Sequence, residues 1–359
     1  MMDAGKLGRI LKSMEEHDVP QLIISDPLAI YYLVGKKIAP GERMLALLLN
    51  VNGNHKMVIN ELFPQDEDLG VELVWYNDIQ DGVEILSQFI EKDKTVGIDK
   101  TWPSRFLIRL QELGAGSKFV NGSPIVDYVR MIKDEHEQEL MRKASLENDK
   151  IMEQLIPMVV KGYTELELNA IVRDMYKKTG HSDVSFDPIT GYGRSGADPH
   201  HVTDNTKGKR GDSVVLDIGG ILDNYCSDMT RTFYCKSVDD EQAEIHDLVR
   251  TAVEKAEAVI KPGVRFCDID AQARDLIDEA GYSEYWKIRL GHFIGQEDHE
   301  YGDVSPINKN VAEPGMIFSI EPGIYIEGKY GVRIEDLVLV TEDGHELLNA
   351  VEKKWRIVG

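Results

Sequence analysis

The sequence predicts an α+β protein built from two domains, and three observations support this prediction. At 359 residues the chain is longer than a single ordinary hydrophobic core can serve. Strand-like and helix-like segments alternate through the first third of the chain. A faint internal repeat then divides the remainder. We place the boundary near residues 128–133, so that residues 1–130 form one domain and residues 131–359 the other.

The N-terminal part has the pattern of a small α/β domain. Amphipathic segments near residues 81–91 and 103–113 predict helices, and five short apolar segments predict strands. The strand segments are PQLIIS, MLALLLN, HKMVIN, VELVWY and TVGID, with the turn NVNGN between the second and the third. A long charged run without glycine begins near Lys133 and predicts the helix that opens the second domain.

The second part contains the weak repeat. Two turn–helix segments, KGYTELELNAIVRDMYKKTG and KPGVRFCDIDAQARDLIDEAG, each end in glycine. Each follows a long helix and precedes a two-stranded stretch that carries two acidic residues. Two copies of helix–helix–hairpin predict a pseudo-symmetric domain in which both hairpins contribute to one sheet.

The composition excludes several classes of function. The chain has 63 acidic and 41 basic residues, a formal net charge of −22, and such a surface repels nucleic acid and anionic membranes. No apolar run approaches the roughly 20 residues of a membrane helix, and the start MMDAGKLGRI lacks a signal pattern. Three cysteines without a CxxC pair favour a reducing compartment. We therefore expect a cytoplasmic protein that binds neither nucleic acid nor membranes.

The first hairpin holds an aspartate in an unfavourable place. Asp217 lies in the apolar strand VVLDIGG, where an unpaired carboxylate would be costly to bury, and Asp228 follows eleven residues later. With a turn at Leu222-Asp223, the two aspartates lie directly opposite each other and share one face of the hairpin.

The second hairpin repeats this arrangement, because a turn centred on Gly328 places Glu321 opposite Glu335. Four ionised carboxylates in one pocket cannot coexist without cations or strongly raised pKa values. His292, in the stretch GHFIGQEDHE, supplies a neutral donor. This oxygen-rich set suits Mn²⁺ or a similar divalent ion. Two such ions would neutralise the four acids, activate a bridging water and polarise a substrate carbonyl.

These motifs resemble those of the pita-bread metallopeptidases, the family of methionine aminopeptidase, aminopeptidase P, prolidase and creatinase. The matching stretches are LDIGGILDNYCSDMTRTF, GHFIGQEDHE, EPGMIFSIEPGIYI and GVRIEDLVLV, and the resemblance covers the chain from about residue 130 to its end. The N-terminal part resembles the extra α/β domain of prolidase, aminopeptidase P and creatinase. The resemblance therefore implies a pita-bread catalytic domain over residues 131–359, preceded by a creatinase-like α/β domain over residues 1–130.

The resemblance also implies a metal centre with five protein ligands. Asp217 would bind one ion, His292 and Glu321 the other ion, and Asp228 and Glu335 both ions. Glu321 would in addition carry a proton from the bridging water to the leaving nitrogen.

Three further side chains receive roles from the same resemblance. His200, in the stretch ADPHH, would contact the substrate near the scissile bond, and His299 would stabilise the tetrahedral intermediate. Arg333 alternates onto the same strand face as Glu335 and would hold a ligand carboxylate in place. The alternative for Arg333 is an ordinary surface cation.

The function implied by the resemblance is that of a prolidase, which hydrolyses Xaa-Pro dipeptides with a hydroxide that bridges two divalent ions. The expected cofactor is two Mn²⁺ ions per subunit, with Co²⁺ or Zn²⁺ as alternatives, and the expected assembly is a homodimer. An Xaa-Pro aminopeptidase that acts on longer peptides is the second hypothesis. A metal-free binding module and a metal-free, creatinase-like amidine hydrolase are disfavoured, because no ligand is lost.

Three departures from the family pattern concern selectivity. Phe293 follows His292 where relatives commonly have glycine, and we expect its ring to narrow or reshape the pocket. His201 also replaces a glycine that is usual in relatives. Asp303 stands where many relatives have an arginine, which in some of them contacts the proline carboxylate. Three side chains are candidates to replace that arginine: Arg194, Arg289 and His201.

Overall fold

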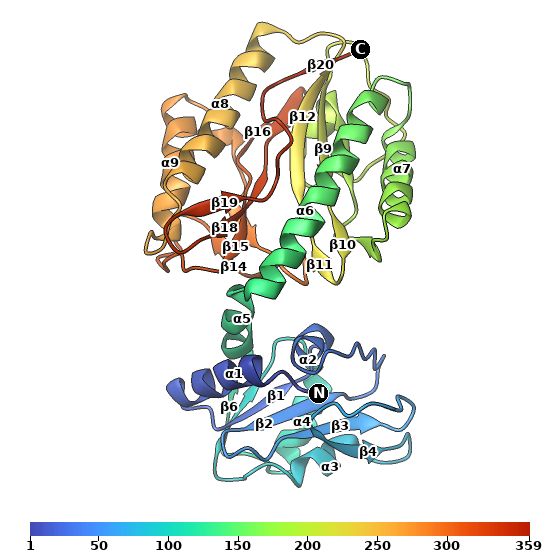
Figure 1. Cartoon of the computed structure of the whole chain (residues 1–359), viewed down its shortest axis with the longest axis vertical. Helices are drawn as coiled ribbons and strands as arrows, with labels where there is room; N and C mark the ends of the chain where they lie inside the picture. Colours follow the sequence, from blue (N-terminus) through green and yellow to red (C-terminus); the bar gives the residue numbers. More distant parts are fainter. The chain divides into compact units, whose positions relative to one another are not determined.

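The computed structural model describes residues 1–359, which form two units, Met1–Arg130 and Met131–Gly359 (Figure 1). Each unit has its own hydrophobic cores. None of the helices combines the length and the hydropathy that a membrane span requires.

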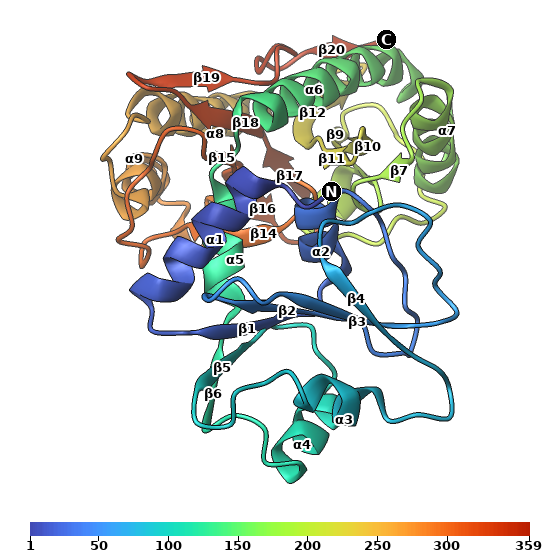
Figure 2. The ribbon, with the colours of Figure 1, turned by 60° about the horizontal axis from the view of Figure 1, so that its bottom comes forward.

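The N-terminal unit is a mixed six-stranded sheet with helices on both faces (Figure 2). Its strand order is β4-β3-β2-β1-β5-β6, in which β1 is antiparallel to β2 and parallel to β5. The strands are β1 (Gln21–Ile24), β2 (Ala46–Asn50), β3 (Lys56–Asn60), β4 (Glu72–Tyr76), β5 (Thr95–Ile98) and β6 (Lys118–Asn121). The helices are α1 (Ala4–Glu16), α2 (Pro27–Val34), α3 (Gly82–Ser87), α4 (Ser104–Glu112) and α5 (Ser123–Met131).

Alternating residues of the central strands enter two different cores. Leu22 and Ile24 of β1 pack with residues of α1, α2 and α5, whereas Ile23 packs with residues of α3 and α4. Successive side chains of a strand point to opposite faces of the sheet, so this sheet is covered on both sides. The strand-like and helix-like segments recognised in the sequence correspond to these elements.

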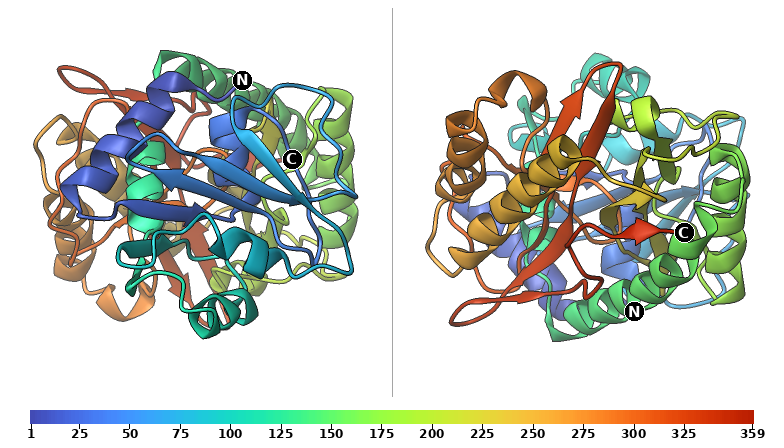
Figure 3. Two further views of the ribbon diagram at one scale, coloured as in Figure 1. Left: turned by 90° about the horizontal axis from the view of Figure 1, so that it is seen from below. Right: turned by 90° about the horizontal axis from the view of Figure 1, so that it is seen from above.

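The C-terminal unit consists of two similar halves. In each half, two helices precede a set of mainly antiparallel strands and pack on them through a separate core. The two helix pairs lie on opposite sides of the strands (Figure 3, right). The order helix–helix–hairpin therefore occurs twice, as the faint repeat predicts.

The elements of this unit fall into the same two groups. The first half contains α6 (Glu135–Leu155), α7 (Glu165–Lys178), β7 (Asp183–Val184), β8 (Ile189–Tyr192), β9 (Ser213–Ile218), β10 (Gly220–Leu222), β11 (Tyr225–Cys226) and β12 (Met229–Cys235). The second half contains α8 (Asp240–Ala258), α9 (Phe266–Glu279), β13 (Gly291–Phe293), β14 (Glu300–Val304), β15 (Ile317–Ile320), β16 (Gly323–Ile326), β17 (Tyr330–Arg333), β18 (Asp336–Val340) and β19 (His345–Leu347), followed by β20 (Ile357–Val358).

Three of the four long helices begin at a capping box. Asp134, Thr164 and Asp239 each accept a hydrogen bond from the backbone three residues later, and the side chain at that later position accepts from the cap. This reciprocal pair satisfies two backbone donors that the first helical turn leaves free. The starts of α6, α7 and α8 are therefore fixed locally.

The first hairpin turns one residue later than its sequence predicts. Its turn residues are Asp223 and Asn224, whose φ angles of 49° and 69° are typical of a tight type I′ turn. Asp217 consequently pairs with Thr230, and the predicted pairing of Asp217 with Asp228 is wrong. The shift in register amounts to two residues, so both aspartates keep the same face of the hairpin.

The second hairpin has the predicted register. Gly323 pairs with Arg333, which centres the hairpin on Gly328. The same register continues into β15 and β18 and places Glu321 across from Glu335.

Hydrogen bonds from β12 join the two hairpins. Thr232 Oγ1 donates to the Arg333 carbonyl at 2.8 Å, and the Glu335 amide donates to the Thr230 carbonyl at 3.1 Å. Because β12 also pairs with β9, the strand that carries Asp217, the acids of both hairpins meet.

Phe293 lies in the core of the second half and not in a pocket. Its ring is fully buried and packs against the rings of Phe266 and Phe318, with 5.4 Å between ring centroids in each pair. His292 precedes it on β13 and therefore faces the opposite side of the strand. The expectation that Phe293 narrows the substrate pocket is wrong.

We predict that Phe293→Ala destabilises the C-terminal unit by about 3–5 kcal/mol, because it leaves a cavity among aromatic side chains. The more conservative Phe293→Leu should cost clearly less. Chemical denaturation followed by tryptophan fluorescence measures both values. An unchanged midpoint for Phe293→Ala would contradict this placement of the ring.

Candidate metal centre and active site

A cavity of about 1090 Å³ lies beside the joined hairpins in the C-terminal unit. Side chains from α7, β8, β9, β13 and β17 contribute to its wall, together with residues of the segments between strands. Every side chain that the sequence analysis assigned to the site lines this cavity: Asp217, Asp228, His292, Glu321, Glu335, His200, His299 and Arg333.

The tightest group in the cavity consists of Asp228, His292 and Glu335, whose ligand atoms all lie within 4.8 Å of one another. His292 Nε2 is 3.5 Å from Asp228 Oδ2 and 3.9 Å from Glu335 Oε1. Glu321 Oε1 also lies 3.5 Å from this nitrogen. One imidazole therefore faces three carboxylates at distances suited to a shared cation.

His292 presents an unprotonated nitrogen to these acids. Its Nδ1 lies 3.2 Å from the Phe293 carbonyl, which can only accept a hydrogen bond, so the ring proton belongs on Nδ1. Burial lowers the pKa of His292 to about 3, which keeps the ring neutral. The free lone pair on Nε2 is the form of histidine that binds metal ions.

Arg333 is buried and orients Asp217. Its Nη2 donates to Asp217 Oδ2 at 2.5 Å, and its Nη1 donates to the Tyr325 hydroxyl at 3.0 Å and to the Pro199 carbonyl at 3.2 Å. With 3% of its surface exposed, it is not an ordinary surface cation. The same guanidinium thus fixes a carboxylate of the centre and the residue before His200.

Three carboxylate oxygens of the centre are buried without a hydrogen-bond partner: Asp217 Oδ1, Asp228 Oδ1 and Glu335 Oε1. Burial, followed by the repulsion of neighbouring carboxylates, raises the pKa of Asp228 and of Glu335 well above the usual range. An uncompensated buried charge is strongly unfavourable, so these carboxyl groups hold protons when no metal is bound and need cations when they are ionised. Four carboxylates and one neutral imidazole fit divalent metal ions.

Glu321 differs from the other acids because a proton can exchange on it near neutral pH. Burial raises the pKa of Glu321 to about 7, although the nearby Arg333 acts in the opposite direction. Ser319 Oγ donates to Glu321 Oε1 at 3.2 Å and accepts from the His292 amide at 3.0 Å. The carboxyl group is therefore held in place beside the imidazole.

His299 is half-exposed and lies over the metal-binding ring. Its ring centroid is 3.9 Å from that of His292. Arg289 Nη2 lies 3.2 Å from His299 Nδ1, and because a guanidinium can only donate, the proton of the neutral ring belongs on Nε2. Burial, together with this arginine, lowers the pKa of His299. The ring is thus a neutral donor that faces the cavity.

Hydrogen bonds to a buried carboxylate, that of Glu165, hold the loop that carries His200. Glu165, which is fully buried, accepts hydrogen bonds from His201 Nε2 at 2.6 Å, the Asp204 amide at 3.1 Å and the Tyr192 amide at 3.0 Å. His201 is therefore already occupied.

Three side chains were candidates to bind a substrate carboxylate. Of these, Arg289 lines the cavity and donates to the neutral ring of His299, which leaves other guanidinium donors for a ligand. His201 lines it as well but is held by Glu165, and Arg194 does not line it. Asp303 also lies outside the cavity lining, where it accepts a hydrogen bond from Ser305 Oγ at 2.8 Å.

The sequence analysis missed two acids of the cavity, Asp187, which pairs with Arg173, and Asp298. Burial raises the pKa of Asp298 to about 8, and the carboxylates of Asp217 and Glu321 act in the same direction. A signal was present, because Asp298 directly precedes His299 in GHFIGQEDHE. The surrounding run of acids resembles an ordinary solvated surface, so this signal is weak.

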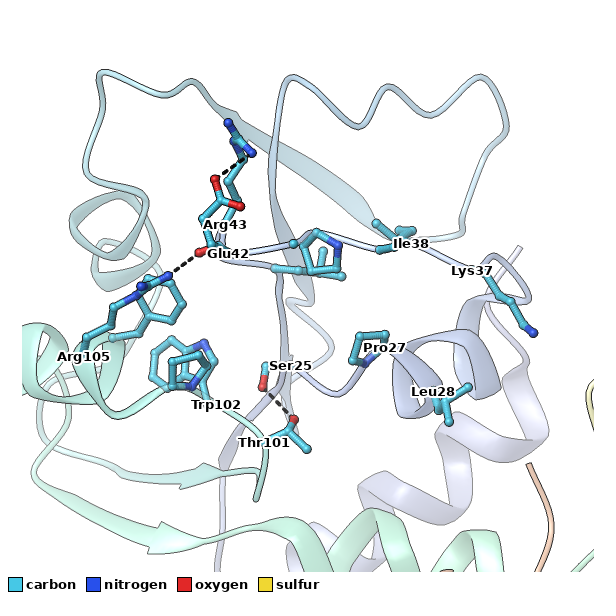
Figure 4. Close-up of a pocket in the computed structure, with 16 residues that line it drawn as sticks. Ser25, Pro27, Leu28, Lys37, Ile38, Glu42, Arg43, Thr101, Trp102 and Arg105 are labelled. Carbon is cyan, nitrogen blue, oxygen red and sulfur yellow. Dashed lines mark hydrogen bonds and ion pairs between the residues drawn. The ribbon is translucent and has the colours of Figure 1, made fainter. Parts of the chain in front are cut away.

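A second cavity, of about 540 Å³, lies within the N-terminal unit (Figure 4). Trp102, Phe106 and Ile38 contribute to its mainly apolar lining. Two groups of three histidine and acidic side chains are close enough together to hold a metal ion, and both lie in the C-terminal unit. They are Asp228, His292 and Glu335, and Glu165, His201 and Asp204. The N-terminal cavity therefore lacks the chemistry of the first one.

Comparison with known proteins agrees with the fold and the site, which together define a metallopeptidase. Metallopeptidase family M24 matches residues 139–342, and the creatinase/prolidase N-terminal domain matches residues 6–132. The chain belongs to metallopeptidase family M24 and has the pita-bread fold that its motifs imply.

Similar proteins cover the whole chain. A peptidase of Staphylococcus aureus (strain bovine RF122 / ET3-1), described as uncharacterized, is 35% identical over 97% of this chain and 99% of its own. The prolidase of Thermococcus sibiricus is 30% identical, with a TM-score of 0.92 over 100% of this chain and 99% of its own. The Xaa-Pro dipeptidase of Bacillus anthracis is 27% identical, with a TM-score of 0.90 over 99% of both chains.

The raised carboxyl pKa values predict how the metal-free protein responds to pH. Between the ordinary pKa of a glutamate and the value of about 7 for Glu321, the folded state binds more protons than the unfolded state. The contribution of Glu321 to stability therefore falls as the pH rises through this window, and Asp228 and Glu335 act in the same direction. The lowered pKa of His292 acts in the opposite direction below about pH 6.5, so the net fall is expected above it. Divalent ions bind the deprotonated carboxylates, so they should restore more stability at higher pH.

We accordingly expect Mn²⁺ to raise the melting temperature of chelator-treated protein more at about pH 8 than at about pH 5. Differential scanning fluorimetry with and without Mn²⁺ measures the two increments. Equal increments at both pH values would contradict the account.

Proposed function

We propose that this metallopeptidase is a prolidase, which hydrolyses the Xaa-Pro bond of dipeptides at a dinuclear metal centre. The observation that carries the proposal is the position of three carboxylates, those of Asp228, Glu321 and Glu335, 3.5–3.9 Å from the neutral imidazole of His292. Asp217 lines the same cavity, and three of the four acids keep a buried oxygen without a partner. When bound, two divalent ions supply an activated water and polarise the scissile carbonyl.

We take the assignment of ligands to the two ions from the resemblance to the family, and the side chains line one cavity as that assignment requires. Asp217 would hold one ion, His292 and Glu321 the other, and Asp228 and Glu335 both. Mn²⁺ fits a set dominated by carboxylates, with Co²⁺ or Zn²⁺ as alternatives. Arg333 would keep the Asp217 carboxylate oriented through its 2.5 Å hydrogen bond.

The remaining steps belong to residues of the chain. Glu321 would accept a proton from the attacking water and pass it to the proline nitrogen. His299 would donate its Nε2 proton to the oxyanion that forms on the carbonyl. His200, on the loop that Arg333 and Glu165 fasten, would contact the substrate beside the scissile bond.

Substrate length depends on whether the pocket binds a free carboxylate close to the proline. Arg289 lines the cavity, and its guanidinium has further donors besides the one at His299. We propose that it binds the carboxylate of a dipeptide, which favours a dipeptidase over an Xaa-Pro aminopeptidase. By resemblance to the family we further propose that the protein is a homodimer.

Asp228→Asn should abolish hydrolysis and reduce the number of bound metal ions at the same time, because it removes a charge from the oxygens shared by both ions. Elemental analysis and an Ala-Pro hydrolysis assay measure the two quantities. Asp303→Asn is the matched control, with the same charge change outside the cavity lining. A fully metallated and active Asp228→Asn variant would overturn the assignment of this ligand.

His299→Ala should retain both ions but lose about 10²-fold in kcat, because one donor to the oxyanion is removed. Steady-state kinetics combined with elemental analysis distinguishes this loss from a loss of metal. If the ions leave instead, His299 belongs among the ligands.

Arg289→Met should reduce kcat/KM for Ala-Pro more than for Ala-Pro-Ala, since the tripeptide places no carboxylate beside the proline. Any effect transmitted through His299 acts on both substrates and cancels in their ratio. Arg289→Lys, which keeps the charge, should change this ratio less. An unchanged ratio in Arg289→Met would show that another group binds the carboxylate.

A further inference from the structure

We propose that Asp298 is a sixth protein ligand of the metal centre and binds, together with Asp228, one of its divalent ions. This inference rests on the dinuclear centre proposed above and extends it by one carboxylate. The two acids come from opposite halves of the C-terminal unit, since Asp228 precedes β12 and Asp298 lies between β13 and β14.

The position of Asp298 is that of a potential ligand. Asp298 lines the same cavity as the five other ligands. Its side chain interacts with that of Asp228. Two carboxylates in such contact are both acceptors, so something positive must lie between them when both are ionised.

Asp298 shares an unpartnered buried oxygen with three of the five proposed ligands. Asp298 Oδ1 is buried and has no hydrogen-bond partner, as do Asp217 Oδ1, Asp228 Oδ1 and Glu335 Oε1. Buried polar atoms are almost always paired, so unpartnered carboxylate oxygens concentrated in one cavity point to a common cation.

No cationic side chain donates a hydrogen bond to Asp298 Oδ1. Arg333 is engaged with Asp217 at 2.5 Å, and Arg289 with His299 Nδ1 at 3.2 Å. His299 Nε2 approaches the other oxygen of Asp298, Oδ2, at a long 3.4 Å. Asp298 Oδ1 is therefore left without a cation from the chain.

The consequence concerns charge as well as geometry. With Asp298 the centre holds five carboxylates against the charge of two divalent ions. An added carboxylate ligand strengthens the attraction for each ion and raises its coordination number. Metal affinity, and not only catalysis, should therefore depend on this residue.

The test compares Mn²⁺ binding to wild-type protein and to Asp298→Asn by isothermal titration calorimetry after chelator treatment. We expect wild-type protein to bind two ions, and Asp298→Asn to bind at least one of them with a Kd raised about tenfold or more. Asp187→Asn is the matched control. It removes the same charge from a residue that lines the same cavity and is paired with Arg173, and it should leave both Kd values unchanged.

A second measurement distinguishes a ligand from a neighbouring charge. In Co²⁺-loaded protein the visible absorption intensifies when the ion loses a ligand, so Asp298→Asn should give a stronger band than wild-type protein and Asp187→Asn should not. Asp298→Glu, which keeps a carboxylate, should bind Mn²⁺ more tightly than Asp298→Asn. This comparison also serves if the asparagine variant folds poorly.

Wild-type Kd values and an unchanged Co²⁺ spectrum in Asp298→Asn would overturn the inference and leave the dinuclear centre intact. Weaker binding with an unchanged spectrum would also overturn it, because Asp298 would then act only through Asp228. Failure of wild-type protein to bind two ions would instead contradict the proposed function, and the inference would fall with it.

Discussion

The mutual repulsion of buried carboxylates is the constraint on which the rest of this structure depends. Asp217, Asp228, Glu321 and Glu335 converge on one cavity, and three of them leave an oxygen without a partner. The side chains that contact these carboxylates directly include one neutral imidazole and one guanidinium, those of His292 and Arg333. Positive charge must therefore come from outside the chain, which makes the fold of the catalytic unit a scaffold for cations.

The pseudo-symmetry of the catalytic unit explains how such a group is assembled. Each half contributes a hairpin that ends in two acids, and hydrogen bonds between β12 and residues 333–335 bring the hairpins together. Helix pairs on opposite sides bury the outer faces of the strands in separate cores. The repulsive centre is thus held at the junction of two independently stabilised halves.

Much of this arrangement was predictable because the acids lie in strands or directly beside them, at fixed spacings. The predicted turn of the first hairpin was wrong by one residue, so the predicted pairing was wrong by two. Asp217 and Asp228 nevertheless lie on one face, as predicted. Contacts between distant segments were not predictable. Phe293 lies next to a predicted ligand but enters the aromatic core, and Asp298 is distinguished from its acidic neighbours only by the partner it meets across the cavity. Spacing encodes which face a side chain occupies, whereas only tertiary structure determines what that face touches.

The central claim is metal-dependent cleavage of Xaa-Pro dipeptides, and one comparison tests it most directly. Ala-Pro and Ala-Pro-Ala are offered to chelator-treated protein and to the same protein reloaded with Mn²⁺. The account predicts cleavage of Ala-Pro by the reloaded protein alone, with little cleavage of the tripeptide. Preference for Ala-Pro-Ala would identify an Xaa-Pro aminopeptidase, and no cleavage of either peptide after reloading would contradict the assignment of this site to proline-peptide hydrolysis.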